Sequence, residues 1–287
     1  MALTAEEILT YPALHRSVQA QSRALIAIYE TSPRLASIFA TQQRWLLGHV
    51  GLSMHFRQVP GDPLTELTMA RFIKVVSDNA VASRNTAEAF LKEMLHYNIA
   101  EYLPARDGRA RPLRPTAATI RTFSGWVIAH LRTLDDLDGG DRLSIFLYRP
   151  DMLNRLQPLI ADGLLASIPV REPKQTFSLF IWLNNGGIVM DWLMSGINPD
   201  HADLDRIPTS VVSIGDFASW LHLSRTHLAR KLRDAEELGS IGWLGKRGHS
   251  VMWVSKAFHQ EYMMVQAAKL AVVAAAFEAC LEAPRRG

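Results

Sequence analysis

Cationic side chains recur on one face of the stretch 224–238. Its apolar residues fall at helical spacing and predict the buried face of an amphipathic helix: Leu228, Leu232, Ala235 and Leu238. The opposite face carries the polar residues Thr226, Arg230, Arg233 and Glu237. An arginine donates from a planar fork of N–H groups, which suits the edge of a guanine base or a phosphate group. The chemistry that this face indicates is recognition of a nucleic acid.

The residues around this helix predict how it is positioned. Ser213 and Ser224 each precede a helical stretch, and a serine oxygen can accept the free N–H groups of a first turn. Gly239 can end the second helix in the left-handed conformation. Two apolar runs, 241–244 and 251–254, then predict a β-hairpin. Helix, tight turn, helix and hairpin is the layout of a winged helix-turn-helix, whose second helix enters the major groove.

The run Ser-Arg-Thr-His-Leu-Ala-Arg-Lys-Leu that starts at Ser224, with the Leu-Gly stop and the hairpin after it, resembles the MarR family of bacterial transcription regulators. The resemblance implies that the serine begins the recognition helix and that polar residues near Thr226 and Arg230 approach base edges. The candidate DNA contacts of this segment are Ser224, Arg225, Thr226, His227, Arg230, Arg233, Lys246 and Arg247. An ordinary amphipathic helix before a hairpin is the alternative interpretation.

The first half of the chain repeats this pattern. Thr68 can cap a helix, a second helix begins at Ser83, Asn98 stands at its end, and 99–103 is strand-like. Placing Ser83 on Ser224 gives an offset of 224 − 83 = 141 residues and predicts an internal repeat. The candidate DNA contacts on the first recognition helix are Ser83, Arg84, Asn85, Thr86 and Lys92.

The stretch 105–116 is rich in arginine and resembles the wing of the MarR family, where an Asp-x-Arg pair lies in the hairpin. Asp107 and Arg109 match that pair, and Arg111 is a further candidate contact. The resemblance implies that the arginine enters the minor groove while the aspartate holds it. A narrow minor groove concentrates negative potential, which attracts arginine. The second hairpin lacks the pair, and a solvated basic loop is the alternative interpretation of the first.

We therefore expect a mainly α fold, with a minor β component, built from tandem winged helix-turn-helix units with long flanking helices in a pseudo-twofold arrangement. The acidic, glycine-containing stretch 135–141 marks the boundary between residues 1–138 (core 68–116) and residues 139–287 (core 213–255). MarR proteins dimerise through their terminal helices and bind DNA as symmetric dimers. The resemblance thus implies a single-chain pseudo-dimer on an asymmetric site of double-stranded DNA, whether or not the chain dimerises further. Its recognition helices would lie roughly 34 Å apart.

Composition bears on whether the protein binds nucleic acid, contains disulfides, is secreted or spans a membrane. The formal net charge of +3 is compatible with nucleic acid but decides little, because local patches matter more. The single cysteine, Cys280, excludes an intramolecular disulfide. The acidic N-terminus does not resemble a signal peptide, and the uncharged run 175–190 is too short and too polar for a membrane span. We expect a soluble cytoplasmic protein without a membrane anchor.

No catalytic or metal-binding pattern stands out, so we expect neither an enzyme nor a cofactor nor a metal site. The chain lacks Gly-x-Ser-x-Gly, Walker and His-Glu-x-x-His motifs. Tryptophans are usually core residues, but four of them are candidates for lining the cavity of a small-molecule effector: Trp45, Trp126, Trp182 and Trp192. A plasmid-type replication initiator and a winged-helix scaffold that binds protein remain as alternative functions.

Overall fold

The computed structural model describes residues 2–31, 41–104, 111–149 and 151–282. These residues form a mainly helical protein with two small antiparallel sheets, which confirms the expected mainly α class. The helices of the first half are α1 (Ala5–Thr10), α2 (Leu14–Thr31), α4 (Gln42–Phe56), α5 (Met69–Asp78), α6 (Arg84–His96) and α7 (Ala117–Asp138). Those of the second half are α8 (Arg142–Leu147), α9 (Met152–Ala166), α10 (Ile168–Arg171), α11 (Gln175–Ile181), α12 (Gly186–Ser195), the 3-10 helix η1 (Pro199–His201), α13 (Ile214–Trp220), α14 (Arg225–Glu237) and α15 (Lys256–Glu282).

The strands form one hairpin in each half. In the first half β1 (Ala100–Tyr102) pairs with β2 (Leu113–Pro115). In the second half β4 (Ile241–Trp243) pairs with β5 (Met252–Ser255). A strand that the sequence did not indicate, β3 (Arg206–Pro208), adds to the other edge of β5.

Most helix starts follow the predicted caps. The hydroxyl groups of Thr68, Ser83 and Ser213 each accept the backbone N–H three residues on. The hydroxyl group of Thr116 does the same at the start of α7. Ser224 stands at the N-cap position of α14 but makes no capping hydrogen bond, so the prediction that its side chain caps this helix is wrong. The hydroxyl of Ser224 is exposed at the start of α14 and is available to another partner.

The helix ends are as predicted. Asn98 after α6 and Gly239 after α14 both lie in the left-handed region, with φ of 55° and 69°. Gly139 ends α7 in the same region, with φ of 74°. Glycine adopts this conformation without a steric penalty, and asparagine tolerates it.

The segments around α6 and α14 share their backbone geometry. Both helices have 13 residues, and their first residues are 225 − 84 = 141 apart. Several backbone hydrogen bonds recur in both segments: Ile99 N–H to Met94 O and Ser240 N–H to Ala235 O, Thr116 N–H to Ile99 O and Ser255 N–H to Ser240 O, Leu103 N–H to Pro112 O and Leu244 N–H to Val251 O.

The strand register shows which residues of the two halves are equivalent before and after the hairpin tips. Ala100 pairs with Pro115, and Ile241 pairs with Val254. The offset between the halves is thus 241 − 100 = 141 before the hairpin tips and 254 − 115 = 139 after them. The second hairpin is two residues shorter, and the helices α7 and α15 begin at equivalent places.

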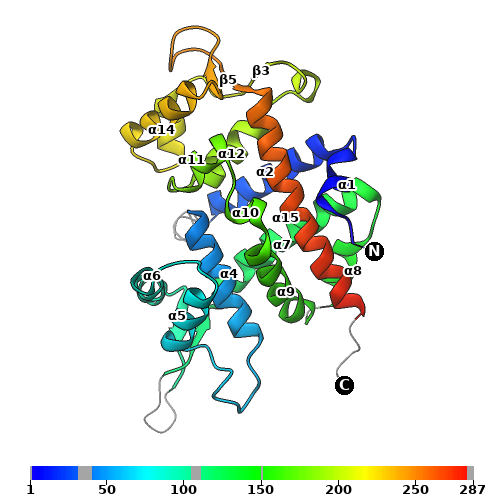
Figure 1. The fold of residues 1–287 in the computed structure, drawn as a ribbon, viewed down its shortest axis with the longest axis vertical. Coiled ribbons are helices and arrows are strands. Elements are labelled where there is room, and N and C mark those ends of the chain that lie inside the picture. The colour runs from blue at the N-terminus through cyan, green and yellow to red at the C-terminus, as the bar shows by residue number, and fades with distance from the viewer. Residues whose placement is uncertain (1, 32–40, 105–110, 150, 283–287) are drawn as a thin grey trace.

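Helices of the two halves interleave. From the first half, α4 packs on α9 and α2 packs on α12, so each half contributes helices to the other's core. The long helices α7 and α15 contact each other, and α2 packs on α7 as α9 packs on α15. Figure 1 shows α15 in orange and red, running from β5 through the length of this helical body. The buried apolar residues of both halves form one continuous core.

Among the described residues, α15 is long and apolar enough to cross a membrane by length and composition alone. Its apolar surface contacts α1, α7, α9, α10 and α11. Large side chains such as Phe258, Tyr262 and Phe277 are fully buried within the protein. Packing inside the protein therefore accounts for the apolar character of this helix.

Candidate nucleic-acid interface and ligand cavity

The polar face of α14 makes no contact with a charged or hydrogen-bonding partner in the part of the chain that the structure describes. Leu228, Leu232 and Ala235 on the opposite face are fully buried, which fixes the rotation of the helix. The prediction that Leu238 shares this buried face is wrong, because Leu238 is the C-cap residue of α14 and is 57% exposed. Arg230 and Arg233 are exposed. Like Arg225, also exposed, they form no ion pair or side-chain hydrogen bond with the rest of the described chain. These guanidinium groups keep all their donors for an external acceptor, and the exposed Thr226 lies beside them.

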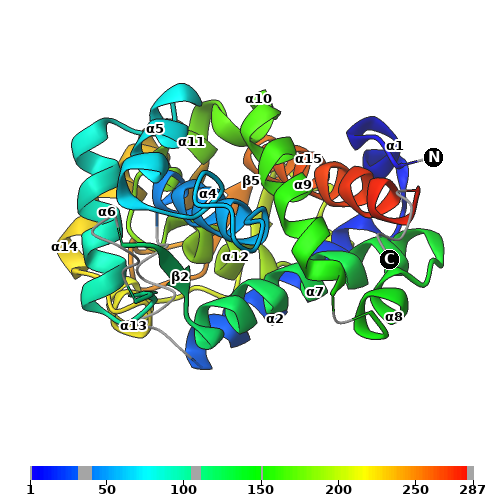
Figure 2. The same cartoon turned by 90° about the horizontal axis from the view of Figure 1, so that it is seen from below.

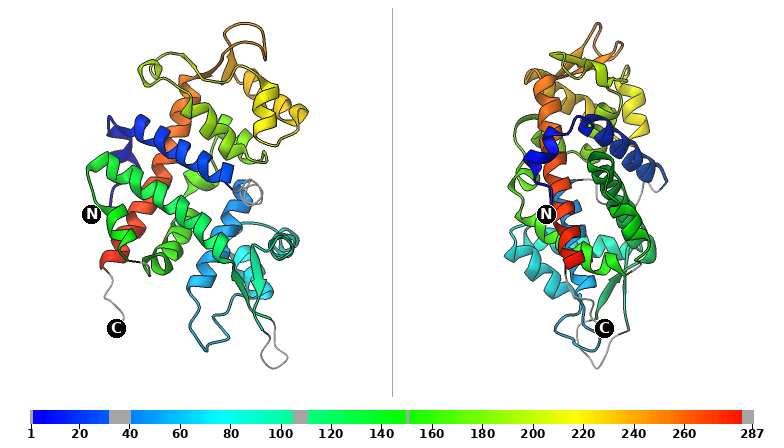
Figure 3. Two further views of the ribbon diagram at one scale, coloured as in Figure 1. Left: turned by 180° about the vertical axis from the view of Figure 1, so that it is seen from behind. Right: turned by 90° about the vertical axis from the view of Figure 1, so that its right-hand side faces the viewer.

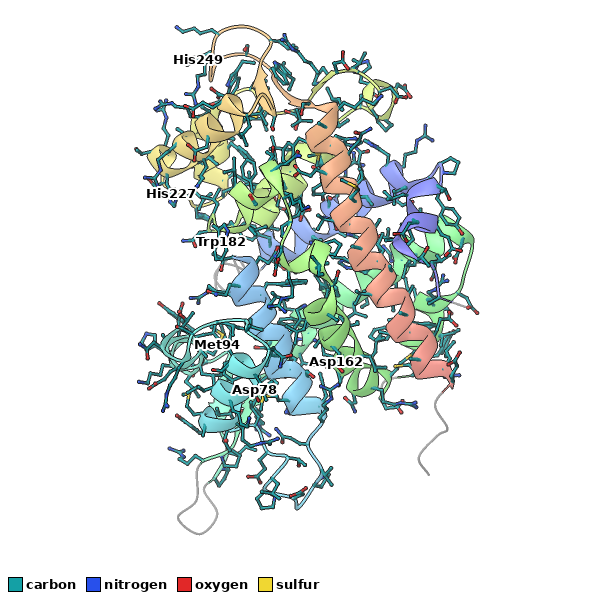
Figure 4. The ribbon with its side chains drawn as sticks, viewed as in Figure 1. Asp78, Met94, Asp162, Trp182, His227 and His249 are labelled. Carbon is teal, nitrogen blue, oxygen red and sulfur yellow. The ribbon has the colours of Figure 1, made fainter. Side chains whose placement is uncertain are left out.

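The second hairpin is fastened to α14. Arg247 donates to the Glu236 carboxylate at 2.8 Å and to the Ala229 carbonyl oxygen at 3.3 Å. Trp243 Nε1 donates to the same carboxylate at 3.0 Å. Among the candidate contacts here, Lys246 stays exposed, while Arg247 is occupied by an internal pair. In Figure 4 the labelled His227 and His249 lie on α14 and on this hairpin, away from the helical body.

The corresponding face of α6 is less cationic. Arg84 and Asn85 are exposed. Lys92 is paired with Glu88 one turn earlier, with 2.7 Å between Nζ and Oε1. The remaining two candidates serve the helix start: Ser83 accepts from the backbone N–H of Thr86, and their hydroxyl groups are hydrogen-bonded to each other.

Two candidates of the first hairpin, Asp107 and Arg109, lie outside the described residues. The guanidinium carbon of Arg111, at the start of the described part, lies 4.5 Å from the ring centroid of Tyr102. Across the strands, Arg114 pairs with Glu101 at 2.6 Å. The described base of this hairpin therefore keeps its cationic groups close to aromatic and acidic neighbours.

The helices α6 and α14 lie on one side of the molecule. Figures 1 and 2 both place α6 and α14 on the same side, and Figure 1 separates them along the longest axis. Figure 3 shows the strands β1 and β2 toward one end of that axis and β4 and β5 toward the other. Trp182, labelled in Figure 4, lies between the two helices on this side and is 64% exposed.

A cavity of about 210 Å³ lies between the two halves. Its walls come from α2, α4, α7, α11, α12 and α15, and its main lining residues are Tyr29, Trp45, Phe123, Trp126, Phe177, Asn185, Asp191 and Lys269. Of the four tryptophans considered from the sequence, Trp45 and Trp126 line this cavity. Trp182 is exposed, and Trp192 packs on Trp220 with 4.0 Å between ring centroids.

One cation and one carboxyl group face this cavity. The Nζ atom of Lys269 lies 5.5 Å from the ring centroid of Trp45 and 5.9 Å from that of Phe177. Burial lowers the pKa of Lys269, and the attraction of Asp191 partly opposes this effect. Burial raises the pKa of Asp191 to about 6, against the opposing hydrogen bond from Tyr262.

Two buried histidines stand beside the cavity. His49 contacts the rings of both Trp45 and Phe123, and His130 packs on Trp126 with 3.7 Å between ring centroids. Burial lowers the pKa of each to about 3, so both are neutral near neutral pH. Within the described ranges, no cluster of three or more His, Cys, Asp or Glu side chains could hold a metal ion.

Sequence reasoning missed the polar groups of the cavity. Lys269 stands in an alanine-rich helix, and Asp191 stands in the apolar run of α12. One signal in the sequence could have pointed to them, namely a single charged residue within an apolar run. The side chain of such a residue either extends to the protein surface or faces a partner or a cavity.

A scan against protein-family models, a search of curated proteins and a search of solved structures found no match to this chain. No family is shown by these comparisons. The arrangement of the side chains is therefore the ground for a functional proposal.

Proposed function

We propose that the protein is a cytoplasmic transcription regulator that binds double-stranded DNA through two unlike winged helix-turn-helix units in one chain. In this proposal α6 and α14 are the recognition helices, and the β1–β2 and β4–β5 hairpins are the wings. The proposed architecture is that of a MarR-type dimer fused into a single chain. The observation that carries the proposal is the shared backbone geometry around α6 and α14, combined with their position on one side of the molecule.

The helix contacts support a pseudo-twofold arrangement. The two halves can be matched helix by helix: α1 with α8, α2 with α9, α4 with α12 and α7 with α15. When the two helices of each matched pair are exchanged, several of the observed contacts become other observed contacts. The α2–α12 contact becomes α9–α4, the α2–α7 contact becomes α9–α15, and the α1–α15 contact becomes α8–α7. The α7–α15 contact maps onto itself, as an axis between these two helices requires. Two recognition helices related by such an axis can enter successive major grooves.

The distribution of free arginines supports unequal roles for the two units. On α14, Arg225, Arg230 and Arg233 are exposed and have no partner among the described residues, whereas Lys92 on α6 already pairs with Glu88. Exposed arginines can neutralise phosphates or bind a guanine edge in two places. We therefore assign most of the binding energy to the half-site under α14.

Binding to random-sequence duplex DNA at two salt concentrations tests the proposal. Because each neutralised phosphate releases counterions, affinity should fall steeply between roughly 50 and 200 mM salt. Arg230→Ala should cost about 1–3 kcal/mol of binding and relax the preference at one base position. Arg132→Ala, an exposed arginine on α7, is the matched control and should bind as the wild type does. If the protein does not bind DNA, or if its affinity does not change with the salt concentration, the protein-binding scaffold is favoured instead.

A further inference from the structure

We propose that the cavity between the two halves binds one small apolar α-amino acid, whose carboxylate meets Lys269 and whose ammonium group meets Asp191. The ligand's side chain would lie against the aromatic walls formed by Trp45, Trp126 and Phe177. Its effect on DNA binding rests on the proposed function, whereas the binding itself does not.

The volume limits the ligand to a small molecule. The cavity measures about 210 Å³. A protein cavity of roughly 150 Å³ lined by apolar side chains holds benzene, which has six non-hydrogen atoms. By proportion this cavity holds about eight or nine non-hydrogen atoms, the size of valine or leucine.

Lys269 supplies the anion-binding group. Lys269 is mostly buried, and it lines the cavity. Within the described chain, no carboxylate lies within ion-pair distance of its Nζ atom, and no side chain or carbonyl accepts a hydrogen bond from it. This atom lies over the rings of Trp45 and Phe177, 5.5 Å and 5.9 Å from their centroids. A desolvated ammonium group without an anion is costly, so a carboxylate that enters the cavity gains a strong partner.

Asp191 supplies the cation-binding group on the α12 wall. It retains only 7% of its exposed surface. Its Oδ1 atom accepts from Tyr262 at 2.5 Å and from Ser22 at 3.5 Å, while Oδ2 has no hydrogen-bond donor among the described residues. The unused Oδ2 atom of Asp191 fits an ammonium group.

The two halves of the molecule contribute different residues to the cavity, and this difference determines how many ligands one chain binds. The offset of 139 residues after the hairpins relates the cap Thr116 to Ser255 (255 − 116 = 139) and His130 to Lys269 (269 − 130 = 139). His130 is neutral, donates to the Trp126 carbonyl oxygen at 2.8 Å and cannot anchor an anion. The cation is therefore present on one side of the pseudo-twofold axis, and we infer one ligand per chain.

Isothermal titration calorimetry of the full chain without DNA tests the charges one at a time. The probes are L-leucine, isocaproate, which lacks the ammonium group, and isoamylamine, which lacks the carboxylate. L-Leucine should bind at one per chain, and each analogue should bind at least about tenfold more weakly, because each leaves one buried charge unpaired. Isocaproate that binds as tightly as leucine would overturn the proposal, since the cavity would then take only an anion. No heat with any of the three probes would also overturn it.

Two near-isosteric variants assign the contacts. Lys269→Met should lose leucine and isocaproate binding while isoamylamine binding persists, and Asp191→Asn should show the reverse pattern. The matched controls, Lys174→Met and Asp200→Asn, change exposed residues and should bind leucine as the wild type does. Thermal unfolding reports whether each variant folds, and the analogue series on the wild type decides the proposal if one does not. Leucine binding without any DNA binding would keep this inference and remove only the proposed function.

Discussion

At the residue scale, His49 and His130 are buried bases in the core. Gln157 donates to His49 Nδ1, and His130 Nδ1 donates to the Trp126 carbonyl oxygen. The Nε2 atom of each histidine has no partner within the described residues. A protonated ring here would be a buried charge without an anion, which is why the pKa of each lies at about 3.

These two histidines predict a stability that falls in acid. The unfolded chain binds their protons near pH 6.5, whereas the folded protein does so only near pH 3. Their contribution to the unfolding free energy is therefore complete above pH 6.5 and is lost progressively as the pH falls from 6.5 to about 3. At about 1.4 kcal/mol per pH unit for each residue, the loss by pH 5 is on the order of 4 kcal/mol. Asp191, whose pKa is raised to about 6, opposes this by about 1 kcal/mol at pH 5.

Urea unfolding between pH 7 and pH 5 measures this loss. The double variant His49→Gln/His130→Gln should show a flatter dependence of the unfolding free energy on pH, whatever its stability at pH 7. His201→Gln changes an exposed histidine and should keep the wild-type slope. Equal slopes for all three proteins would mean that the buried histidines do not carry the acid sensitivity.

At the element scale, the corner between α11 and α12 determines one wall of the cavity. Asn185 adopts φ of 59° at this corner, and the next residue, Gly186, begins α12. A Cβ atom at Gly186 would lie 1.7 Å from the carbonyl oxygen of Phe180. Only glycine allows this approach of two backbone segments, so the corner depends on it.

Neighbouring glycines at this corner should respond differently to alanine. Gly186→Ala must displace backbone and should lower the unfolding free energy by several kcal/mol. A Cβ atom at Gly187 meets nothing within 4 Å, so Gly187→Ala should stay within about 1 kcal/mol of the wild type and can even stabilise the helix. Urea unfolding of both variants checks this contrast. Similar effects of the two substitutions would show that the close approach at Gly186 is relieved without cost.

At the scale of the whole molecule, the interleaved helices make each half depend on the other. Without residues 139–287, α4 loses α9 and α2 loses α12, which exposes a large apolar surface. We predict that the fragment 1–138 alone lacks a cooperative thermal transition. Co-expression with the fragment 139–287 should restore one, because the missing contacts form between the chains. Circular dichroism of the single and paired fragments measures this. A cooperative transition of the lone fragment near that of the full chain would contradict the prediction.

The sequence by itself determined the local features. The helix ends at Ser83, Thr116 and Gly239 and the two hairpins depend on residues a few positions apart, and capping and left-handed glycine are properties of such neighbours. The buried face of α14 was predictable for Leu228, Leu232 and Ala235, because helical periodicity needs only the chain itself. The same periodicity failed for Leu238, which stands at the helix end and is exposed.

Only the tertiary structure decided which distant residues meet. Lys269 and Asp191 face one cavity because α12 and α15 pack around it, and Arg247 turns to Glu236 because the second hairpin folds back on α14. In the sequence, Trp182 and Trp192 are as good candidates for lining the cavity as Trp45 and Trp126, yet they lie outside it. Such pairings are set by long-range packing and desolvation, whose energies depend on the whole core, and no local pattern of residues encodes them.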